Sequence, residues 1–309
     1  MTGGCRRIEV SFPSGDASCA AWLYLPDPAA TARPDARRPV VVLGHGLGAT
    51  RDMSLDAFAE DFRADGYACV VFDYRHFGDS GGQPRQLLDI EQELTDWSSA
   101  IAYARSHPSC DPERVVLWGS SFGGGHALTA AARDGNVAAV VAQCPFTDGI
   151  ASILRHDPVA SMRVAARAVR DVVGAARGRA PVTVGLVGRR RSAALLTAPD
   201  ALPGYAALLT PGTTFRNEVA ARFAFQLPRY RPGRRLREVR CPVLLCLCSE
   251  DSVAPTARTR RYAAAGTRTR LHEYPFGHFA IYLDGEREVV LHDQLEFLRR
   301  EVPIESGAA

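Results

Sequence analysis

The chain has 309 residues, enough for one large domain or for one domain that carries a sizeable insertion. Hydrophobic residues make up 46% of it and charged residues 23%, which are ordinary values for a globular protein and exclude a disordered or fibrous chain. The net charge of +3 is small and spread along the sequence, so it argues against a nucleic-acid partner and favours a small-molecule partner.

Eight cysteines lie mainly within apolar runs, a distribution typical of buried free thiols in a reducing compartment. Cys246 and Cys248 have C-x-C spacing, but no second pair of ligands is nearby, so we expect no metal site. The N-terminal segment lacks the apolar core of a signal peptide, and no apolar run reaches the length of a membrane span. We therefore expect a cytoplasmic protein without a membrane partner.

The first half of the chain alternates predicted strands and helices. The turn "PSGD" at 13–16 separates two short strands and predicts an antiparallel hairpin. The later strands are continuous apolar runs, which are typical of a parallel sheet covered on both faces. The predicted strands lie at 6–12, 19–26, 39–46, 67–75, 114–121 and 137–145, and the predicted helices at 54–65, 89–106 and 123–133.

This alternation stops after residue 148 and resumes at residue 239. The segment 149–238 contains a predicted helix at 160–176 and apolar pieces rich in proline and glycine, and we predict that it is a cap inserted over one edge of the sheet. Strands at 240–248 and 270–276 and helices at 254–265 and 286–300 follow it. The predicted fold is an α/β core of residues 1–148 and 239–309, with about eight mostly parallel strands and helices on both faces.

The stretch "LWGSSFGGG" at 117–125 carries the main signal for chemistry. The pattern G-x-S-x-G fits only with Ser121 at its centre, between Gly119 and Gly123. A nucleophile on a sharp strand-to-helix turn has a strained backbone, and its neighbours must lack side chains so that strand and helix approach closely. A predicted strand precedes the pattern and a predicted helix follows it. Ser121, rather than Ser120, is therefore the candidate nucleophile.

Five motifs together resemble the α/β-hydrolase superfamily, nearest to its dienelactone-hydrolase and X-Pro-peptidase-like branch of serine esterases and acyl hydrolases. They are "LGHGLG" at 43–48, "DYRHFGDSGG" at 73–82, "GSSFGG" at 119–124, "SEDSVAP" at 249–255 and "YPFGHF" at 274–279. The resemblance covers most of the chain apart from the cap. It implies an α/β-hydrolase fold and a Ser-His-Asp triad that needs no metal and no organic cofactor.

The resemblance also implies which groups assist Ser121. The oxyanion donors would be the backbone N–H groups of Leu47 and Phe122, because two fixed amides stabilise a tetrahedral oxyanion without reorganising. His278, on a loop before the last helix, corresponds to the catalytic base. His45 precedes the serine, against the family's order of serine, acid and histidine, so we expect it to be structural.

The other six histidines are expected to be structural, with a pocket-lining role left open for His76 and His126. The six are His76, His107, His126, His156, His272 and His292.

Two aspartates compete for the role of the acid. Asp251 follows a predicted strand and matches the family's position after the insertion, whereas the adjacent Glu250 falls outside that register. Asp148 is the rival, because some members of the superfamily keep their acid at that earlier strand end. Either would hold the imidazole of the base in the correct tautomer. We favour Asp251 and leave Asp148 open.

Two further patterns have more ordinary interpretations. "DYRHFGDSGG" lacks the G-x-G-x-x-G of a nucleotide loop and is expected to be a structural turn. Arginines at 155, 163, 167 and 170 and in "GRRRS" at 188–192 face either an acidic substrate, such as a coenzyme A carrier, or solvent. We favour solvent, because the chain uses arginine for all of its basic residues.

The predicted function is hydrolysis of a carboxylic ester, or a related acyl bond, of a small molecule. Ser121 attacks, His278 transfers the proton and Asp251 orients it. Alternatives are a lyase, acyltransferase or thioesterase with the same triad, and a non-catalytic binding protein. Apolar cap residues are expected to cover an acyl or aromatic group or to pack among themselves: Leu186, Val187, Leu195, Leu196, Leu208, Leu209, Phe215, Phe223 and Phe225.

Overall fold

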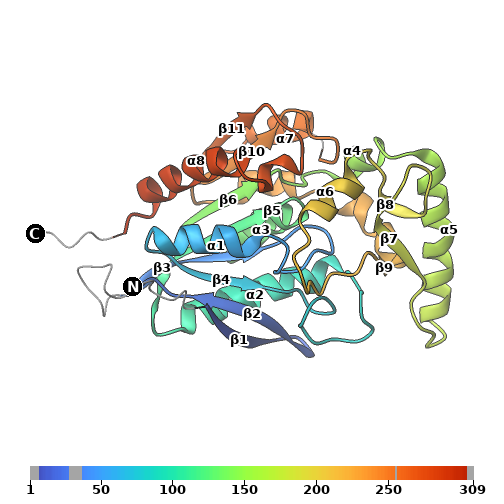
Figure 1. The fold of residues 1–309 in the computed structure, drawn as a ribbon, viewed down its shortest axis with the longest axis horizontal. Coiled ribbons are helices and arrows are strands. Elements are labelled where there is room, and N and C mark those ends of the chain that lie inside the picture. Colours follow the sequence, from blue (N-terminus) through green and yellow to red (C-terminus); the bar gives the residue numbers. More distant parts are fainter. Residues whose placement is uncertain (1–6, 28–36, 255, 305–309) are drawn as a thin grey trace, which may run out of the picture.

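The central element of the protein is an eight-stranded sheet (Figure 1). The computed structural model describes residues 7–27, 37–254 and 256–304. The strand order is β1-β2-β4-β3-β5-β6-β10-β11. β2 pairs antiparallel with β1 and with β4, and all other neighbours are parallel. The predicted hairpin and the mostly parallel sheet are therefore confirmed.

The strands of this sheet have the following bounds: β1 Arg7–Ser14, β2 Ala17–Tyr24, β3 Arg38–Gly44, β4 Ala68–Phe72, β5 Cys110–Ser120, β6 Ala139–Gln143, β10 Val243–Cys248 and β11 Thr269–Tyr274.

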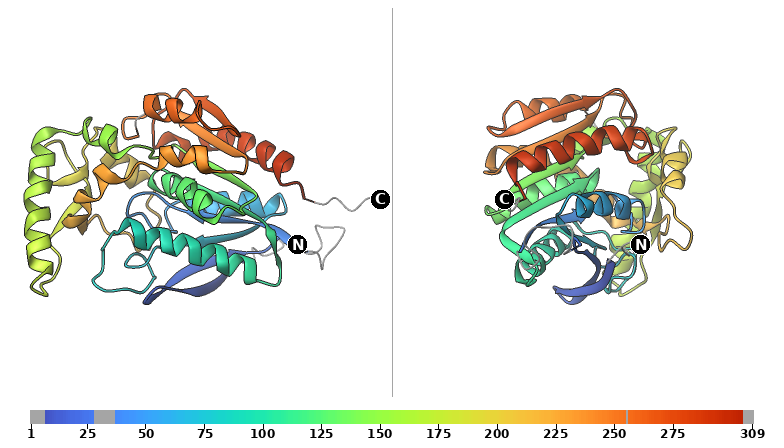
Figure 2. Two further views of the ribbon diagram at one scale, coloured as in Figure 1. Left: turned by 180° about the vertical axis from the view of Figure 1, so that it is seen from behind. Right: turned by 60° about the vertical axis from the view of Figure 1, so that its left-hand side comes forward.

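Side chains alternate between the two faces of the sheet, and both faces are covered. In β3, Val40 and Val42 belong to one hydrophobic cluster, whereas Val41 and Leu43 belong to the other. Helices α2 and α3 supply residues to the first cluster, and α1 and α8 supply residues to the second. Figure 2 shows helices on either side of the sheet. This arrangement explains why the central strands are apolar at nearly every position.

The helices of the core lie where the sequence predicts them, with each end within two residues of the predicted end. Capping helps to define them: the Asp89 side chain accepts a hydrogen bond from the Gln92 backbone N–H at the start of α2. The helices are α1 Leu55–Ala64, α2 Ile90–Ser106, α3 Phe122–Asp134, α7 Thr256–Ala263 and α8 Glu286–Glu301, with a short 3₁₀ helix, η5 Ala280–Tyr282, before α8.

Residues 149–238, which we call the cap segment, lie between β6 and β10 and include a separate three-stranded sheet of order β8-β7-β9. Leu186 of the cap segment packs against Gly48, which follows the carboxyl end of β3. Figures 1 and 2 show the cap segment at one end of the molecule, with α5 outermost. Its elements are α4 Gly149–Ile153, α5 Pro158–Ala175, β7 Thr183–Val187, β8 Ala194–Leu196, α6 Ala201–Ala207, β9 Val219–Ala220, η2 Ala221–Phe225, η3 Leu227–Arg229 and η4 Pro232–Glu238.

The seven described cysteines are free and buried, as predicted, and Cys5 lies outside the described residues. Among the described helices, none combines the length and apolar character needed to cross a membrane.

Candidate active site

Ser121 occupies the turn between the end of β5 and the start of α3. Its backbone has φ 54° and ψ −118°, a conformation rarely adopted by a residue other than glycine. A Cβ atom on Gly119 would lie 2.1 Å from the carbonyl oxygen of Gly123, and one on Gly123 would lie 2.3 Å from that of His45. The strand and helix therefore approach too closely for any side chain at the two glycine positions of the motif.

The structure brings together the three side chains that the sequence singled out. His278 Nε2 lies 3.0 Å from Ser121 Oγ, and His278 Nδ1 lies 2.7 Å from Asp251 Oδ2. Asp251 and His278 follow the carboxyl ends of β10 and β11, which are parallel to β5 in the same sheet. The three residues meet because the carboxyl ends of parallel strands share one edge.

The second oxygen of Asp251 is held by backbone amides. Its Oδ1 accepts hydrogen bonds from the N–H groups of Val253, at 2.7 Å, and Ala254, at 2.6 Å. Asp251 is 5% exposed, so these contacts form away from bulk water. Its orientation toward His278 is therefore fixed on both sides.

The rival acid, Asp148, has other partners. Its Oδ2 accepts hydrogen bonds from Arg231 Nη2, at 2.9 Å, and from the Tyr262 hydroxyl, at 2.5 Å. Its Oδ1 accepts a hydrogen bond from the Ala151 backbone N–H and so caps α4. Within the described residues it has no contact with His278, so the geometry favours the other candidate acid.

The environment of His278 stabilises its protonated form. Burial disfavours the imidazolium, but the adjacent Asp251 carboxylate outweighs this effect and raises the pKa of His278 well above its ordinary value. A proton taken from Ser121 is therefore held on an imidazolium that is paired with a carboxylate.

His45 has the opposite environment. Its Nδ1 lies 3.0 Å from the carbonyl oxygen of Gly46, and its Nε2 lies 3.8 Å from Asp73 Oδ1. Burial lowers the pKa of His45 to about 4, so the imidazole is neutral at neutral pH and the contact with Asp73 is not an ion pair. These contacts agree with the structural role expected for His45.

Two backbone amides lie close to the candidate nucleophile. Phe122 follows Ser121 directly, and the loop that carries Leu47 touches it, because a Cβ on Gly46 would lie 3.1 Å from Ser121 Cβ. Within the described residues, neither the Leu47 nor the Phe122 N–H donates a hydrogen bond. The Leu47 carbonyl accepts one from the Tyr205 hydroxyl of α6, at 2.7 Å. The cap segment thus fixes the peptide group that follows one of the two predicted oxyanion donors.

A cavity of about 20 Å³ opens onto Ser121 and His278, and we call it the serine cavity. This is space for about one water molecule. Tyr205 and Leu208, from α6 and the residue after it, form its cap side, and Tyr282 lies on its core side. Sequence analysis missed both tyrosines because neither belongs to a chemical motif.

The apolar cap residues mostly pack elsewhere. Of the nine that were expected to cover an acyl group or to pack together, Leu208 is the one that lines the serine cavity. Leu186 and Phe223 are buried in a hydrophobic cluster, whereas Leu209 and Phe225 are 42% and 41% exposed. The acyl-covering role of this set stays a prediction, and Leu208 is the member that lies beside Ser121.

The two histidines left open as pocket residues do not line the serine cavity. His76 Nε2 lies 2.9 Å from Gln92 Oε1. His126 lies between Glu93 Oε2, at 2.7 Å, and the Tyr230 hydroxyl, at 2.6 Å, and burial lowers its pKa to about 3. His76 is thus held by a neutral amide, and His126 is held as a neutral ring.

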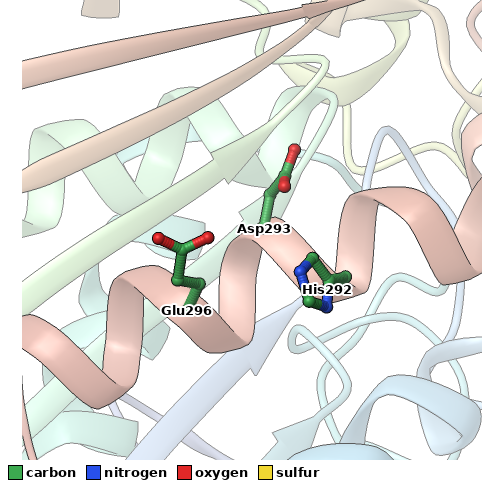
Figure 3. A group of neighbouring side chains, drawn as sticks. All are labelled: His292, Asp293 and Glu296. Carbon is green, nitrogen blue, oxygen red and sulfur yellow. The ribbon is translucent and has the colours of Figure 1, made fainter.

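Three potential metal ligands project from α8: His292, Asp293 and Glu296, whose ligand atoms lie within 4.8 Å of one another (Figure 3). Asp293 Oδ2 already accepts a hydrogen bond from the Tyr274 hydroxyl, at 2.7 Å, and lies 3.1 Å from His272 Nδ1. The other two side chains are exposed, and acidic groups of this kind are common on helix surfaces. We assign no metal to this group.

The doubly covered, mostly parallel sheet and the serine on a strand-to-helix turn define an enzyme of the α/β-hydrolase class. The chain belongs to the serine aminopeptidase S33 family of serine hydrolases, whose model matches residues 35–284. The five sequence motifs also indicated the dienelactone-hydrolase and X-Pro-peptidase-like branch of the superfamily, and that assignment stays a prediction.

Relatives of the chain carry several functional names. The quorum-quenching protein AidA of Acinetobacter baumannii is 48% identical over 297 residues, which are 96% of this chain and 96% of the relative. The polyketide transferase ATR5 of Stachybotrys chlorohalonatus is 28% identical, over 95% of this chain and 97% of its own. The crystal structure of the α/β hydrolase GrgF from Penicillium matches with a TM-score of 0.82 at 23% identity, over 96% of this chain and 99% of that one, and shows the shared fold.

Proposed function

We propose that the protein hydrolyses a carboxylic ester, or a closely related acyl bond, of a small molecule through an acyl-enzyme. The supporting observation is the pair of contacts from Asp251 to His278, at 2.7 Å, and from His278 to Ser121, at 3.0 Å. A serine hydroxyl is a weak nucleophile by itself, and a buried imidazole oriented by a carboxylate activates it. The reaction needs no metal and no organic cofactor.

The proposed reaction begins when Ser121 Oγ bonds to the acyl carbon and its proton moves to His278 Nε2. The resulting oxyanion accepts hydrogen bonds from the Leu47 and Phe122 amides. The bond to the leaving group then breaks, and the leaving group takes the proton from His278. Water attacks the acyl-enzyme by the same route, gives a proton to His278, and releases the acid as Ser121 regains its hydrogen.

The serine cavity also bears on this proposal. A space of about 20 Å³ holds a water molecule but no acyl group, so substrate binding requires lining side chains such as that of Leu208 to move apart. Tyr205 and Leu208 would then border the acyl group.

Transfer of the acyl group to an acceptor other than water is the second candidate, and it includes cleavage of a thioester donor. The relative named polyketide transferase, which aligns with 95% of this chain, favours it. Product analysis in water and with added alcohol or thiol acceptors separates the two candidates, because only transfer yields a new ester or thioester.

Release of p-nitrophenol from acetyl, butyryl and octanoyl esters tests the main proposal. We expect Ser121→Ala to lose the activity and Asp251→Asn to lower kcat by up to about 10⁴-fold. Asp148→Asn is the matched control and should stay within a few-fold of the parent, because Asp148 contacts Arg231 and Tyr262 rather than His278. Activity that survives in Ser121→Ala would refute the proposal. If a fluorophosphonate also fails to label Ser121 in the folded protein, a non-catalytic role is favoured.

A further inference from the structure

A second and larger cavity, of about 810 Å³, lies where the cap segment meets the loop after Asp251. Its volume is within the range of about 300–1,000 Å³ that is typical of small-molecule sites. Residues from both sides line it, including Arg155, Arg189, Arg190 and Leu202 from the cap segment and Ser252 and Val253 from the core. We call it the arginine cavity.

The arginine cavity has an excess of positive charge. Its one lining carboxylate is that of Asp157, which lies 3.2 Å from Arg190 Nε. The side chain of Arg189 is exposed and forms no hydrogen bond or ion pair within the described residues. Burial lowers the pKa of His156, which leaves its ring neutral at neutral pH. Two guanidinium groups, those of Arg155 and Arg189, therefore face the cavity without a carboxylate partner.

The hydroxyl groups at the cavity are partly occupied. Ser252 Oγ donates a hydrogen bond of 2.5 Å to Asp200 Oδ1, and this carboxylate lies beside the lining residue Pro199. Within the described residues, this carboxylate forms no ion pair with Arg155 or Arg189.

Helix α6 separates the arginine cavity from the serine cavity. Leu202 of α6 lines the first, and Tyr205 of the same helix lines the second. Between them, Gly204 lies against the ring of Phe279, where a Cβ atom would come within 2.1 Å of the ring. The two cavities therefore lie on either side of the same short helix.

The arginine cavity borders the loop that carries the candidate acid. Ser252 and Val253 follow Asp251 directly, and Arg155 Nη2 lies 3.5 Å from the Asp251 carbonyl oxygen. In acyl transfer the leaving group takes its proton from the imidazole nitrogen that faces the serine, here His278 Nε2, so it departs next to that ring. A leaving group long enough to pass the ring toward the loop after Asp251 would reach the arginines.

We propose that the arginine cavity binds an anionic group, a phosphate or a carboxylate, on the leaving-group part of the substrate. This inference rests on the proposed acyl hydrolysis and narrows its substrate class. Arginine suits the role because its planar guanidinium binds both anions through paired N–H donors. For these arginines the sequence analysis had favoured solvent and had left an acidic substrate open. The proposal assigns Arg155 and Arg189 to the substrate.

Thioesters that differ only in one anionic group test the proposal. S-butyryl-4′-phosphopantetheine is compared with S-butyryl-pantetheine for phosphate, and S-butyryl-3-mercaptopropionate with its amide for carboxylate. At low salt we expect kcat/KM to favour one anionic member by about tenfold, and the preference to shrink as salt rises. Arg155→Gln and Arg189→Gln should each lower kcat/KM for that anionic substrate by about three- to tenfold and leave its uncharged partner within twofold.

Arg237→Gln is the matched control, since Arg237 is exposed on η4 and does not line the cavity. Equal use of both members of both pairs, or an equal effect of Arg237→Gln, would overturn the proposal. Hydrolysis of p-nitrophenyl butyrate by Ser121 tests the underlying chemistry separately, so loss of that reaction refutes the proposed function instead. Calorimetric titration with 4′-phosphopantetheine and with 3-mercaptopropionate does not depend on turnover. Binding that Arg155→Gln weakens and that the uncharged analogues lack supports the proposal, and no binding of either anion overturns it.

Discussion

Replacement of Tyr205 by phenylalanine tests whether the cap segment holds the oxyanion loop. The Tyr205 hydroxyl donates a hydrogen bond of 2.7 Å to the Leu47 carbonyl, and burial raises its pKa, so it stays protonated. The substitution removes this bond and leaves a buried carbonyl without its partner, at a cost of about 1–2 kcal/mol. If the Leu47 peptide relaxes, the same energy is lost from the transition state, and kcat falls by about 5- to 30-fold.

The assay is steady-state hydrolysis of p-nitrophenyl butyrate, with stability followed by denaturant unfolding. KM should stay within twofold, because an oxyanion contact strengthens only in the transition state. Tyr67→Phe is the matched control: the Tyr67 hydroxyl also donates to a backbone carbonyl, that of Val302, at 3.1 Å, far from the site in sequence. It should lose similar stability and keep its kcat. A Tyr205→Phe protein that is destabilised but has unchanged kcat would refute the reasoning.

Three further predictions follow from burial and backbone geometry. The pKa of His278 is raised well above its ordinary value, and His278 must be neutral to act as the base. We therefore expect kcat/KM to fall with decreasing pH through a midpoint above about 6.5. Asp251→Asn should move that midpoint down, and an unmoved midpoint would contradict the assignment. The same raised pKa stabilises the fold below about pH 6.5, and this stability should be lost as pH rises through the folded-state pKa, which Tm measured against pH checks. Gly119→Ala should prevent correct folding, since its Cβ would meet a backbone oxygen at 2.1 Å, whereas Gly174→Ala, with 3.7 Å to its nearest contact, should fold normally by circular dichroism.

The core and the geometry around Ser121 were predictable because their signals are local. Residues 40–43 of β3 and 115–118 of β5 are apolar at every position, and the two glycines around Ser121 are required by contacts within the same turn and its neighbouring loop. Asp251 and His278 were predictable from motifs at strand ends, where the sheet brings them together. In each case a few consecutive residues contain the whole signal.

The walls of the cavities were not predictable for the opposite reason. The bond from Tyr205 to Leu47 joins residues 158 positions apart, and that from Tyr282 to Ser120 joins residues 162 positions apart. Hydrophobic periodicity says which side of an element is buried but not which distant residue it meets. Leu186, Leu195 and Phe223 of the cap segment are accordingly buried in the same hydrophobic cluster as residues of the central sheet, a contact that the sequence did not indicate.

The position of α6 is constrained in two directions. The backbone of Gly204 already touches the Phe279 ring, so the helix has no room to move inward. Outward movement would break the hydrogen bond from the Tyr205 hydroxyl to the Leu47 carbonyl. Room for an acyl group beyond the cavity of about 20 Å³ must therefore come from its lining side chains, among which Leu208 stands just after the helix. The preference for acyl chain length should depend on the size of that side chain, and substitutions at Leu208 should change this preference more than they change the rate for an acetyl ester.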